Sequence, residues 1–473
     1  MNPWELIQAY PAEITLADGA MLLLIVDRVF LAKRSDYLRH FVASALAALT
    51  CLAALLIAPI SFVATSILLL GAASCLLGRE SRFTTNVGEY YVIVLLATLG
   101  MLVMSSATSW LTAFLGLETA SLSLYTLVAF DKTRATSAEA GLRMFLIGGV
   151  SAAFLLYGLS LVYGITGTLD IGQSGTRLFS HPLDALSLTA MLMILVGFGF
   201  KIAAAPFHLW APDAYQAAPT PAAAFVASAS KVASVVLFLN VFATGLAGPL
   251  ARFGTHSLPL AAGWVPGMLV VAAISMLLGN LAALAQRSVK RLLAYSSIAH
   301  AGYLLTGFAA AGAGNVPAQA LLYYIATYAA ATCGAFGVVA VVEHITGSDD
   351  MESFAGLVKR SPVLAGLLAV FLLSLAGIPP LAGFFAKFQL FLEALHAGGT
   401  IWTAAVILAI ATSCVSLYYY LQVLKRAFVV EAAPDATRFG PAAKSTWFVL
   451  ALLAAVVITA GIWPEAFVAF AGQ

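Results

Sequence analysis

Long apolar stretches constrain the fold of this sequence more than any other feature. Stretches of about 20 residues recur along the whole 473-residue chain, with only short polar gaps between them. A helix needs about that length to cross a bilayer core of about 30 Å. Only 9% of the residues are charged, compared with about 25% in an ordinary soluble domain. We therefore predict an all-α polytopic membrane protein that contacts the lipid bilayer and has no soluble domain.

Hydropathy and turn signals together predict about 14 transmembrane helices. The predicted spans are residues 11–31, 40–57, 60–78, 90–108, 110–130, 144–165, 185–209, 221–243, 263–284, 292–312, 316–343, 362–396, 401–424 and 445–468. The twelfth span is too long for one straight crossing, which indicates a discontinuous helix.

The basic residues orient these spans. Loops and span ends after odd-numbered spans hold 18 of the 23 lysines and arginines, whereas loops after even-numbered spans hold only Arg177 and Arg252. Cytoplasmic loops are enriched in Lys and Arg. Both termini are therefore predicted to lie on the outer face of the membrane.

Composition and motifs exclude several functions. The formal net charge of +2, without a basic tail or an acidic run, points away from a nucleic-acid partner. The chain has no phosphate-binding loop and no dinucleotide fingerprint. Its cysteines lie in apolar stretches without paired spacing, so we expect buried thiols and no metal or iron–sulfur site; they are Cys51, Cys75, Cys333 and Cys414. The sequence thus predicts no cofactor in this chain, and its energy must come from a partner or a gradient.

Four ionisable residues fall inside predicted spans, namely Glu118, Lys201, Lys231 and Lys387. A charge at the centre of a membrane helix costs about 2.5–3.5 kcal/mol, so such groups usually face a protein interior or a wet cavity. Each residue alone could instead snorkel toward a headgroup or form a static ion pair that locks the helices. The set of four together favours an ion pathway.

Helix-breaking residues accompany two of these lysines. Pro206 follows Lys201, and Pro379 and Pro380 precede Lys387. A proline inside a helix removes a backbone hydrogen bond and clashes with the carbonyl four residues earlier. A packing kink would explain a single proline. Two breaks beside two buried lysines predict discontinuous helices 7 and 12, which commonly mark ion sites in transporters.

The order of features occurs twice along the chain. Spans four to eight and spans nine to thirteen each contain a proline-broken helix that carries a lysine. Because five is an odd number, the second unit must have the opposite orientation, which predicts two inverted five-helix repeats. The expected division is 1–89 for helices 1–3, 90–243 for the first repeat, 263–424 for the second repeat and 445–473 for helix 14.

Other polar residues carry weaker predictions. His208 follows the first break and is interpreted equally as a hydrogen-bonded interfacial histidine or as a proton relay. His300 lies in the tenth span with Ser296, Ser297 and Tyr303, a cluster able to hold a water chain. Lys290 is interpreted as a charge that sets topology. Glu343, His344 and Glu393 lie near span ends, where we expect solvated side chains.

Three motifs resemble the antiporter-like membrane subunits of respiratory complex I, the proton-pumping NADH-quinone oxidoreductase. They are "GFKIAAAPFHLWAPDAYQAAPTPAAAFVASASKVASVVLF", "SVKRLLAYSSIAHAGYLLTGF" and "GIPPLAGFFAKFQLF". Within this family the chain is most similar to the branch of subunit N, the ND subunit 2 type. Three features indicate this branch: the segment "YGLSLVYGITGTLD" after the sixth span, Lys387 where the M branch would have glutamate, and no long C-terminal lateral helix.

The resemblance implies a proton relay through Glu118, Lys201, Lys231 and Lys387, with His300 as a weaker candidate. It implies that FMN, iron–sulfur clusters and quinone belong to partner subunits, and that quinone reduction there drives the pump. The partners would be other complex I membrane subunits, in a bacterial inner membrane with both termini periplasmic. The alternatives are a subunit of an Mrp-type cation/proton antiporter or of a membrane-bound hydrogenase, or a structural scaffold whose charges only bind partners.

Overall fold

A computed structural model describes residues 9–58, 61–79, 83–180, 184–246, 264–312, 318–431 and 443–472 of the chain. Among the basic residues used for orientation, Arg82, Arg252 and Arg438 lie outside these ranges, as do the first predicted residues of spans three, nine and eleven. The described ranges contain helices and no strand, which confirms the predicted all-α class.

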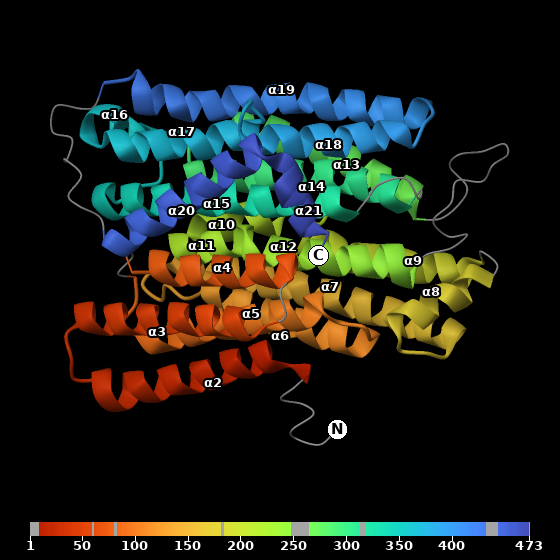
Figure 1. Cartoon of the computed structure of the whole chain (residues 1–473), viewed down its shortest axis with the longest axis horizontal. Coiled ribbons are helices and arrows are strands. Elements are labelled where there is room, and N and C mark those ends of the chain that lie inside the picture. Colours follow the sequence, from red (N-terminus) through yellow and green to blue (C-terminus); the bar gives the residue numbers. More distant parts are fainter. Residues whose placement is uncertain are drawn as a thin grey trace.

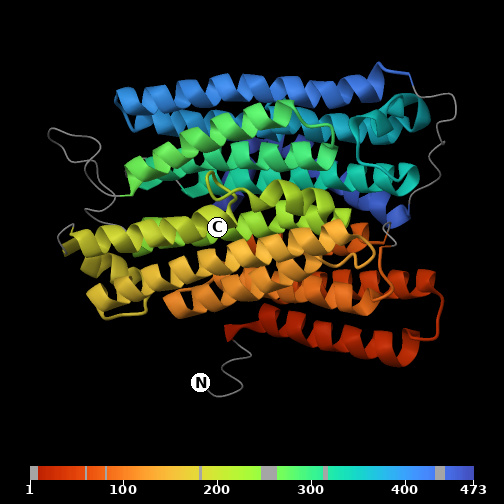
Figure 2. The ribbon, with the colours of Figure 1, turned by 180° about the vertical axis from the view of Figure 1, so that it is seen from behind.

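The helices run roughly side by side in one bundle (Figure 1). Residues 11–57 form one edge and residues 400–428 form the opposite edge, in the front view and from behind (Figure 2). In chain order the elements are α2 (Pro11–Ile25), η1 (Val26–Leu31), α3 (Asp36–Ile57), α4 (Phe62–Leu77), α5 (Val87–Ser105), α6 (Trp110–Val128), α7 (Ala135–Thr166), α8 (Ile171–Ser180), α9 (Ala185–Lys201), α10 (Trp210–Ala217), α11 (Thr220–Ala227), α12 (Ala229–Leu239), η2 (Asn240–Gly245), α13 (Val265–Leu284), α14 (Val289–Gly312), α15 (Ala318–Thr346), η3 (Met351–Phe354), α16 (Leu357–Arg360), α17 (Pro362–Ala376), α18 (Ala382–His396), α19 (Thr400–Phe428), α20 (Lys444–Ile462) and α21 (Pro464–Ala471).

The number of crossings agrees with the sequence. In the part of the chain that the structure describes, nine helical segments are long and apolar enough to span a membrane, and α4, α9 and α17 are shorter apolar helices. The pair α2–η1 and helix α14 supply the two remaining predicted spans. Among these nine segments, the α11–α12–η2 segment and α15 are the most enclosed, with 94% of their most apolar windows buried.

Both predicted helix breaks are present. Helix α9 ends at Lys201, and the chain passes through irregular turns around Pro206 before α10 begins at Trp210. Helix α17 ends at Ala376, where Gly377 adopts a φ of 89°, and α18 begins at Ala382. A glycine with positive φ is the usual C-terminal cap of a helix. The Ala205–Pro206 and Pro379–Pro380 bonds are cis.

A third break corrects the sequence analysis. The predicted eighth span is interrupted at Ser228, whose φ of −116° and ψ of −81° separate α11 from α12. The Ser228 hydroxyl donates to the carbonyl of Ala224 at 2.6 Å, and serine bonding back to the preceding turn often bends a helix. Residues 222–243 contain no proline or glycine, so hydropathy alone predicted a continuous helix.

Smaller differences concern helix ends and one thiol. The fourteenth span ends at Ile462, because the residue before a proline disfavours helical backbone and Pro464 starts the separate helix α21. The sixth span is longer than predicted and begins at Ala135, and helix α8 was not predicted. Three cysteines are buried as expected, but Cys414 is exposed on the surface of the described chain.

Matching backbone geometry recurs at two places, whose first residues are 179 apart and whose second residues are 180 apart. Ser109 pairs with Asp170, and Ser288 pairs with Asp350. In the first pairing the N–H of Trp110 donates to Leu169, and in the second the N–H of Val289 donates to Asp349, at 2.8 and 2.9 Å. The helices that follow, α8 and α16, lie at opposite ends of the bundle (Figure 1). An inverted repeat predicts this arrangement, although the domain limits 1–89, 90–243, 263–424 and 445–473 stay a prediction.

Glycines bring the first two helices of each unit into close contact. A Cβ at Gly100 on α5 would lie 2.5 Å from the backbone nitrogen of Ala120 on α6, and a Cβ at Gly279 on α13 would lie 2.5 Å from that of Ala299 on α14. Small residues allow such backbone approach between membrane helices. This packing sets the positions of Glu118 on α6 and His300 on α14.

Candidate functional site

The structure places all four predicted ionisable residues inside the bundle. Lys231 on α12 and Lys387 on α18 are 3% and 6% exposed. The side chains of Lys201, the last residue of α9, and Glu118 on α6 are 10% and 23% exposed. None of the four is therefore a simple surface charge within the described chain.

One face of α6 forms the surroundings of Lys201. The Nζ of Lys201 lies 3.8 Å from Oε1 of Glu118. It donates to the hydroxyl of Ser121 and lies 3.4 Å from the hydroxyl of Tyr125. Glu118, Ser121 and Tyr125 share a helix face because they are three and four residues apart. The predicted Glu118–Lys201 pair is thus present, and Oε1 of Glu118 has no hydrogen bond within the described chain.

Lys231 and Lys387 bind backbone carbonyls at the helix breaks. The Nζ of Lys231 donates to the carbonyl of Ile202, the residue that caps α9. The Nζ of Lys387 donates to the carbonyls of Leu375 and Ala376, the last residues of α17, at 3.0 and 3.1 Å. The end of a helix leaves carbonyls without an intrahelical partner and carries partial negative charge. The breaks therefore supply the oxygens that stabilise two buried ammonium groups.

The first break serves a different lysine from the one beside it in sequence. Lys201 is adjacent to the break, yet the freed carbonyl of Ile202 binds Lys231 from another helix. Lys387 also donates to the hydroxyl of Ser413 on α19 at 2.8 Å. Lys387 thus has three acceptors, two from the second break and one from α19, whereas Lys231 has one, from the first break.

Two small cavities lie between these groups. A cavity of about 30 Å³ is lined by Ser121, Tyr125, Lys201 and by Ser230 and Ser234 on α12. A cavity of about 10 Å³ is lined by His300, Tyr324, Tyr328 and Lys387. A water molecule requires about 10–15 Å³ of such space and two to four polar partners. The first cavity joins Lys201 to the helix of Lys231, and the second joins His300 to Lys387.

His300 lies at the junction of α14, α15 and α18. Its Nδ1 is 2.7 Å from the hydroxyl of Tyr324, and its ring centroid is 4.8 Å from that of Tyr328. Its Nε2 has no hydrogen-bond partner in the described chain. Of the predicted cluster around it, Ser296 bonds to Tyr420 and Tyr303 bonds to Asn280. Ser297 is the member of this cluster whose hydroxyl makes no hydrogen bond of full geometry with a described residue.

His208 is buried beside the first break, near Pro206. Its side chain is 6% exposed, and its Nδ1 lacks a hydrogen-bond partner in the described part of the chain. The second pair of prolines, Pro379 and Pro380, lies between α17 and α18. Both breaks thus carry a carbonyl-bound lysine, and the first also holds a buried histidine.

Sequence reasoning missed a buried ion pair. Lys290 is 1% exposed, and its Nζ lies 3.0 and 3.2 Å from the two carboxylate oxygens of Glu343. The hydroxyl of Thr220 on α11 also donates to Glu343. Lys290 is therefore not a loop charge, and Glu343, with a side chain only 16% exposed, is not freely solvated. Both residues lie within a turn of predicted span ends, where the sequence gives no sign of burial.

A family profile described as "NADH:quinone oxidoreductase/Mrp antiporter, TM" matches residues 107–415. "NADH-quinone oxidoreductase subunit N 2" of Acidobacterium capsulatum is 46% identical over 471 residues, covering 92% of this chain and 93% of that protein. "NADH-quinone oxidoreductase subunit N" of Desulforamulus reducens is 41% identical, covering 84% of this chain and 80% of that protein.

Solved structures share the fold over nearly the whole chain. A chain of respiratory complex I from Thermus thermophilus, solved with bound aureothin, is 32% identical and superposes with a TM-score of 0.77, covering 97% of this chain and 98% of that chain. A chain of the Mrp complex from Dietzia is 20% identical with a TM-score of 0.78, covering 100% of this chain and 97% of that chain, and shows likeness of fold alone.

Proposed function

Because this chain belongs to the membrane-subunit family shared by NADH:quinone oxidoreductases and Mrp antiporters, we propose that it translocates protons as subunit N of NADH-quinone oxidoreductase. One observation supports this most directly. Glu118, Lys201, Lys231 and Lys387 form a buried series, and two of the lysines bind the free carbonyls of broken helices. Ionisable groups inside a membrane protein usually mark a functional site such as an ion or proton pathway, and this series lies on several helices of the bundle.

The first step of the relay involves Glu118 and Lys201. An ionised Glu118 at 3.8 Å stabilises the ammonium of Lys201. When a neighbouring subunit protonates Glu118 or draws it away, this stabilisation is lost, and Lys201 can release its proton. Water in the 30 Å³ cavity beside Ser230 and Ser234 would carry that proton toward Lys231.

The second step connects Lys231 with Lys387. Helix α12 packs against α15, whose Tyr324 and Tyr328 contact His300. His300 then shares a cavity with Lys387. A neutral imidazole accepts a proton at one nitrogen and releases it from the other, which suits His300 to a bridging role. Lys387 would deliver the proton to the outer side.

The remaining parts of the enzyme are assigned to partners. The chain acts as a membrane subunit within a hetero-oligomer, and FMN, iron–sulfur clusters and quinone would be held by other subunits. We place it in the bacterial inner membrane with both termini periplasmic. No feature of the described residues favours the Mrp antiporter, the hydrogenase or the scaffold alternative over subunit N.

The direct test replaces Lys231 by alanine in the intact complex. We expect assembly and NADH-binding chemistry in the partner subunits to persist, while proton translocation per NADH oxidised falls, because the relay is interrupted. The measurement is proton uptake into inverted membrane vesicles together with NADH oxidation.

The matched control is Lys359→Ala. Lys359 lies on α16 at the surface and pairs with the exposed Glu431, so pumping should be unchanged. Normal pumping by a fully assembled Lys231→Ala complex would eliminate the relay and favour a structural role.

A further inference from the structure

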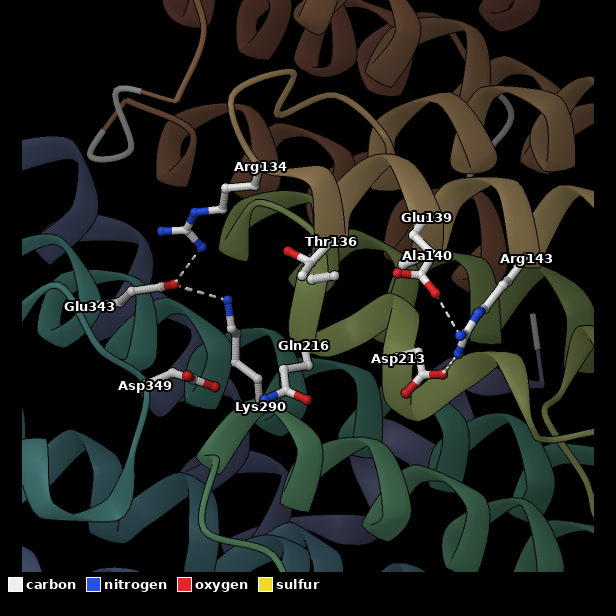
Figure 3. Close-up of a pocket in the computed structure, with 11 residues that line it drawn as sticks. Arg134, Thr136, Glu139, Ala140, Arg143, Asp213, Gln216, Lys290, Glu343 and Asp349 are labelled. Carbon is white, nitrogen blue, oxygen red and sulfur yellow. Dashed lines mark hydrogen bonds and ion pairs between the residues drawn. The ribbon is translucent and has the colours of Figure 1, made fainter.

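A large polar cavity opens on the positively flanked side of the bundle. Its volume is about 410 Å³, and its lining includes Arg134, Arg143, Asp213, Lys290 and Glu343 (Figure 3). The relay proposed above does not include this cavity. The inference below rests on that proposed function and concerns where protons enter the relay.

The Lys290–Glu343 pair stands between this cavity and the protein interior. Glu343 lies between Lys290 and Arg134 (Figure 3), with its Oε1 3.0 Å from Nζ of Lys290 and 3.6 Å from Nη1 of Arg134. Lys290 further contacts the Thr220 hydroxyl at 3.3 Å and the Ala218 carbonyl at 3.5 Å. The carboxylate is therefore partly open to the cavity, whereas the ammonium is enclosed.

Behind the pair, polar side chains continue along two packed helices. On α14, Ser297 lies seven residues and His300 ten residues beyond Lys290. On α15, Thr332 lies eleven residues before Glu343, and Tyr328 lies four residues before Thr332. With 3.6 residues per turn, each series occupies one face of its helix. We call Ser297, Thr332, Tyr328 and Tyr215 of α10 the hydroxyl stripe.

The hydroxyls of the stripe lie next to one another. Ser297 interacts with Tyr215 and with Tyr328, and Thr332 interacts with Tyr328. These side-chain oxygens and Nε2 of His300 are buried, and none of them makes a hydrogen bond of full geometry with another described residue. Buried polar groups are almost always fully paired with protein or with ordered water. A series of adjacent, incompletely paired groups that ends at His300 thus indicates bound water along the stripe.

We propose that Lys290 and Glu343 form a proton-uptake gate for the second step of the relay, which begins at His300. A proton from water in the cavity protonates Glu343. Lys290, now without its counter-charge, gives a proton to water of the hydroxyl stripe, which passes it to Nε2 of His300. The neutral Lys290 amine then takes the proton from Glu343, and the ion pair forms again. One proton has moved from the cavity to His300, and both gate residues return to their first state.

The gate requires a particular chemical property of the side chain of Lys290. Its side chain must release a proton, which a lysine can do and an arginine cannot, because guanidinium stays protonated in proteins. A pair that only locks α14 to α11 and α15 would need the positive charge alone. Lys290→Arg separates these two roles, since it keeps the charge beside Glu343.

The experiment measures proton translocation per NADH oxidised in assembled complexes that carry Lys290→Arg, Glu343→Gln or Thr332→Val. We expect each to lose translocation through this subunit. The control is Thr306→Val, because Thr306 is a buried threonine of α14 whose hydroxyl already donates to the carbonyl of Gly302. Normal translocation in Lys290→Arg overturns the gate.

The Thr332→Val variant decides the question if Lys290→Arg fails to assemble. Valine fills the same space without a hydroxyl, so normal translocation in an assembled Thr332→Val complex also overturns the inference. A normal Lys290→Arg complex beside an inactive Lys231→Ala complex would remove the gate and leave the relay in place. A normal Lys231→Ala complex would remove the relay itself.

Discussion

At the scale of single residues, two of the three relay lysines depend on carbonyl oxygens and have no carboxylate partner among the described residues. Lys387 has three acceptors, from Leu375, Ala376 and Ser413, and Lys231 has one, from Ile202. A hydrogen bond to a charged group contributes about 1.5–3 kcal/mol, and a charge at the centre of a membrane helix costs about 2.5–3.5 kcal/mol. Three such bonds can offset the cost for Lys387, whereas one offsets it only partly for Lys231.

This difference predicts opposite effects on stability for the same substitution. Lys231→Met should leave the stability of the complex unchanged or raise it by about 1–4 kcal/mol, because an apolar isostere removes a poorly compensated buried charge. Lys387→Met should lower stability by about 1–3 kcal/mol, because it leaves carbonyls unpaired. Thermal unfolding of the two purified complexes makes the comparison.

Both methionine variants should also lose proton translocation. Equal melting temperatures in the two variants would contradict the inference that hydrogen bonds stabilise the charge of Lys387 more than that of Lys231. Normal translocation in either variant would contradict the relay.

At the scale of helices, the C-terminal helix α20 supports the second break. Gly461 of α20 lies against the backbone of Pro380, Leu381 and Ala382, so closely that an added Cβ would fall 2.7 Å from the nitrogen of Ala382. The neighbouring Pro380 carbonyl is in direct contact with the same position. The break that provides the carbonyls for Lys387 is therefore packed from outside by a helix distant in sequence.

Adding one methyl group at Gly461 should disturb this packing. Gly461→Ala is expected to destabilise the complex by about 1–3 kcal/mol, because the atoms it would meet belong to the backbone and cannot rotate away. The control is Gly366→Ala in α17, where no atom lies within 4 Å of the added Cβ. A Gly461→Ala complex as stable as the Gly366→Ala complex would show that α20 is free to move away from the break.

At the scale of the whole molecule, the orientation of the bundle determines the direction of transport. His396 ends α18 and Glu431 follows α19, and their side chains are 62% and 82% exposed. One helix crossing separates them, so they must lie on opposite sides of the membrane. From the distribution of basic residues we predict that Glu431 lies on the cytoplasmic side and His396 on the outer side.

Cysteine labelling tests this orientation. In a Cys414→Ala background, which removes the exposed native thiol, a membrane-impermeant maleimide should label His396→Cys in whole cells. It should label Glu431→Cys only after the membrane is opened. The reverse pattern would mean that the protein is inserted the other way round and that the direction of the proposed relay is wrong.

The features predicted from sequence were those that depend on local patterns. The lengths of the apolar stretches predicted the transmembrane helices. Pro206, Pro379 and Pro380 predicted two of the helix breaks, because a proline in the interior of a helix disrupts it. The break at Ser228 was missed because serine bends a helix only in a suitable context. The burial of Lys290 was missed because its partners, Glu343 and Thr220, come from distant segments.

Which oxygen binds which lysine could not be predicted for the same reason. The sequence places Lys201 beside the first break, but only the packing of α12 against the end of α9 brings Lys231 to the carbonyl of Ile202. His300 was predicted in a water-filled cluster, yet two of its expected companions are already hydrogen-bonded elsewhere. The candidate residues could be named from the sequence, but their contacts required the fold.

The position of the second break would make the proposed relay sensitive to the membrane potential. Helices α17 and α18 have 15 residues each, so Lys387 binds its carbonyls about half-way along the crossing. Moving one elementary charge across a membrane takes about 2.3 kcal/mol per 100 mV, and half of that path takes roughly 1.1 kcal/mol. In the proposed relay, each proton that reaches Lys387 from the cytoplasmic side would thus work against part of the membrane potential. A high membrane potential should lower the fraction of Lys387 that is protonated. It should do so at potentials too low to slow the redox reaction in the partner subunits.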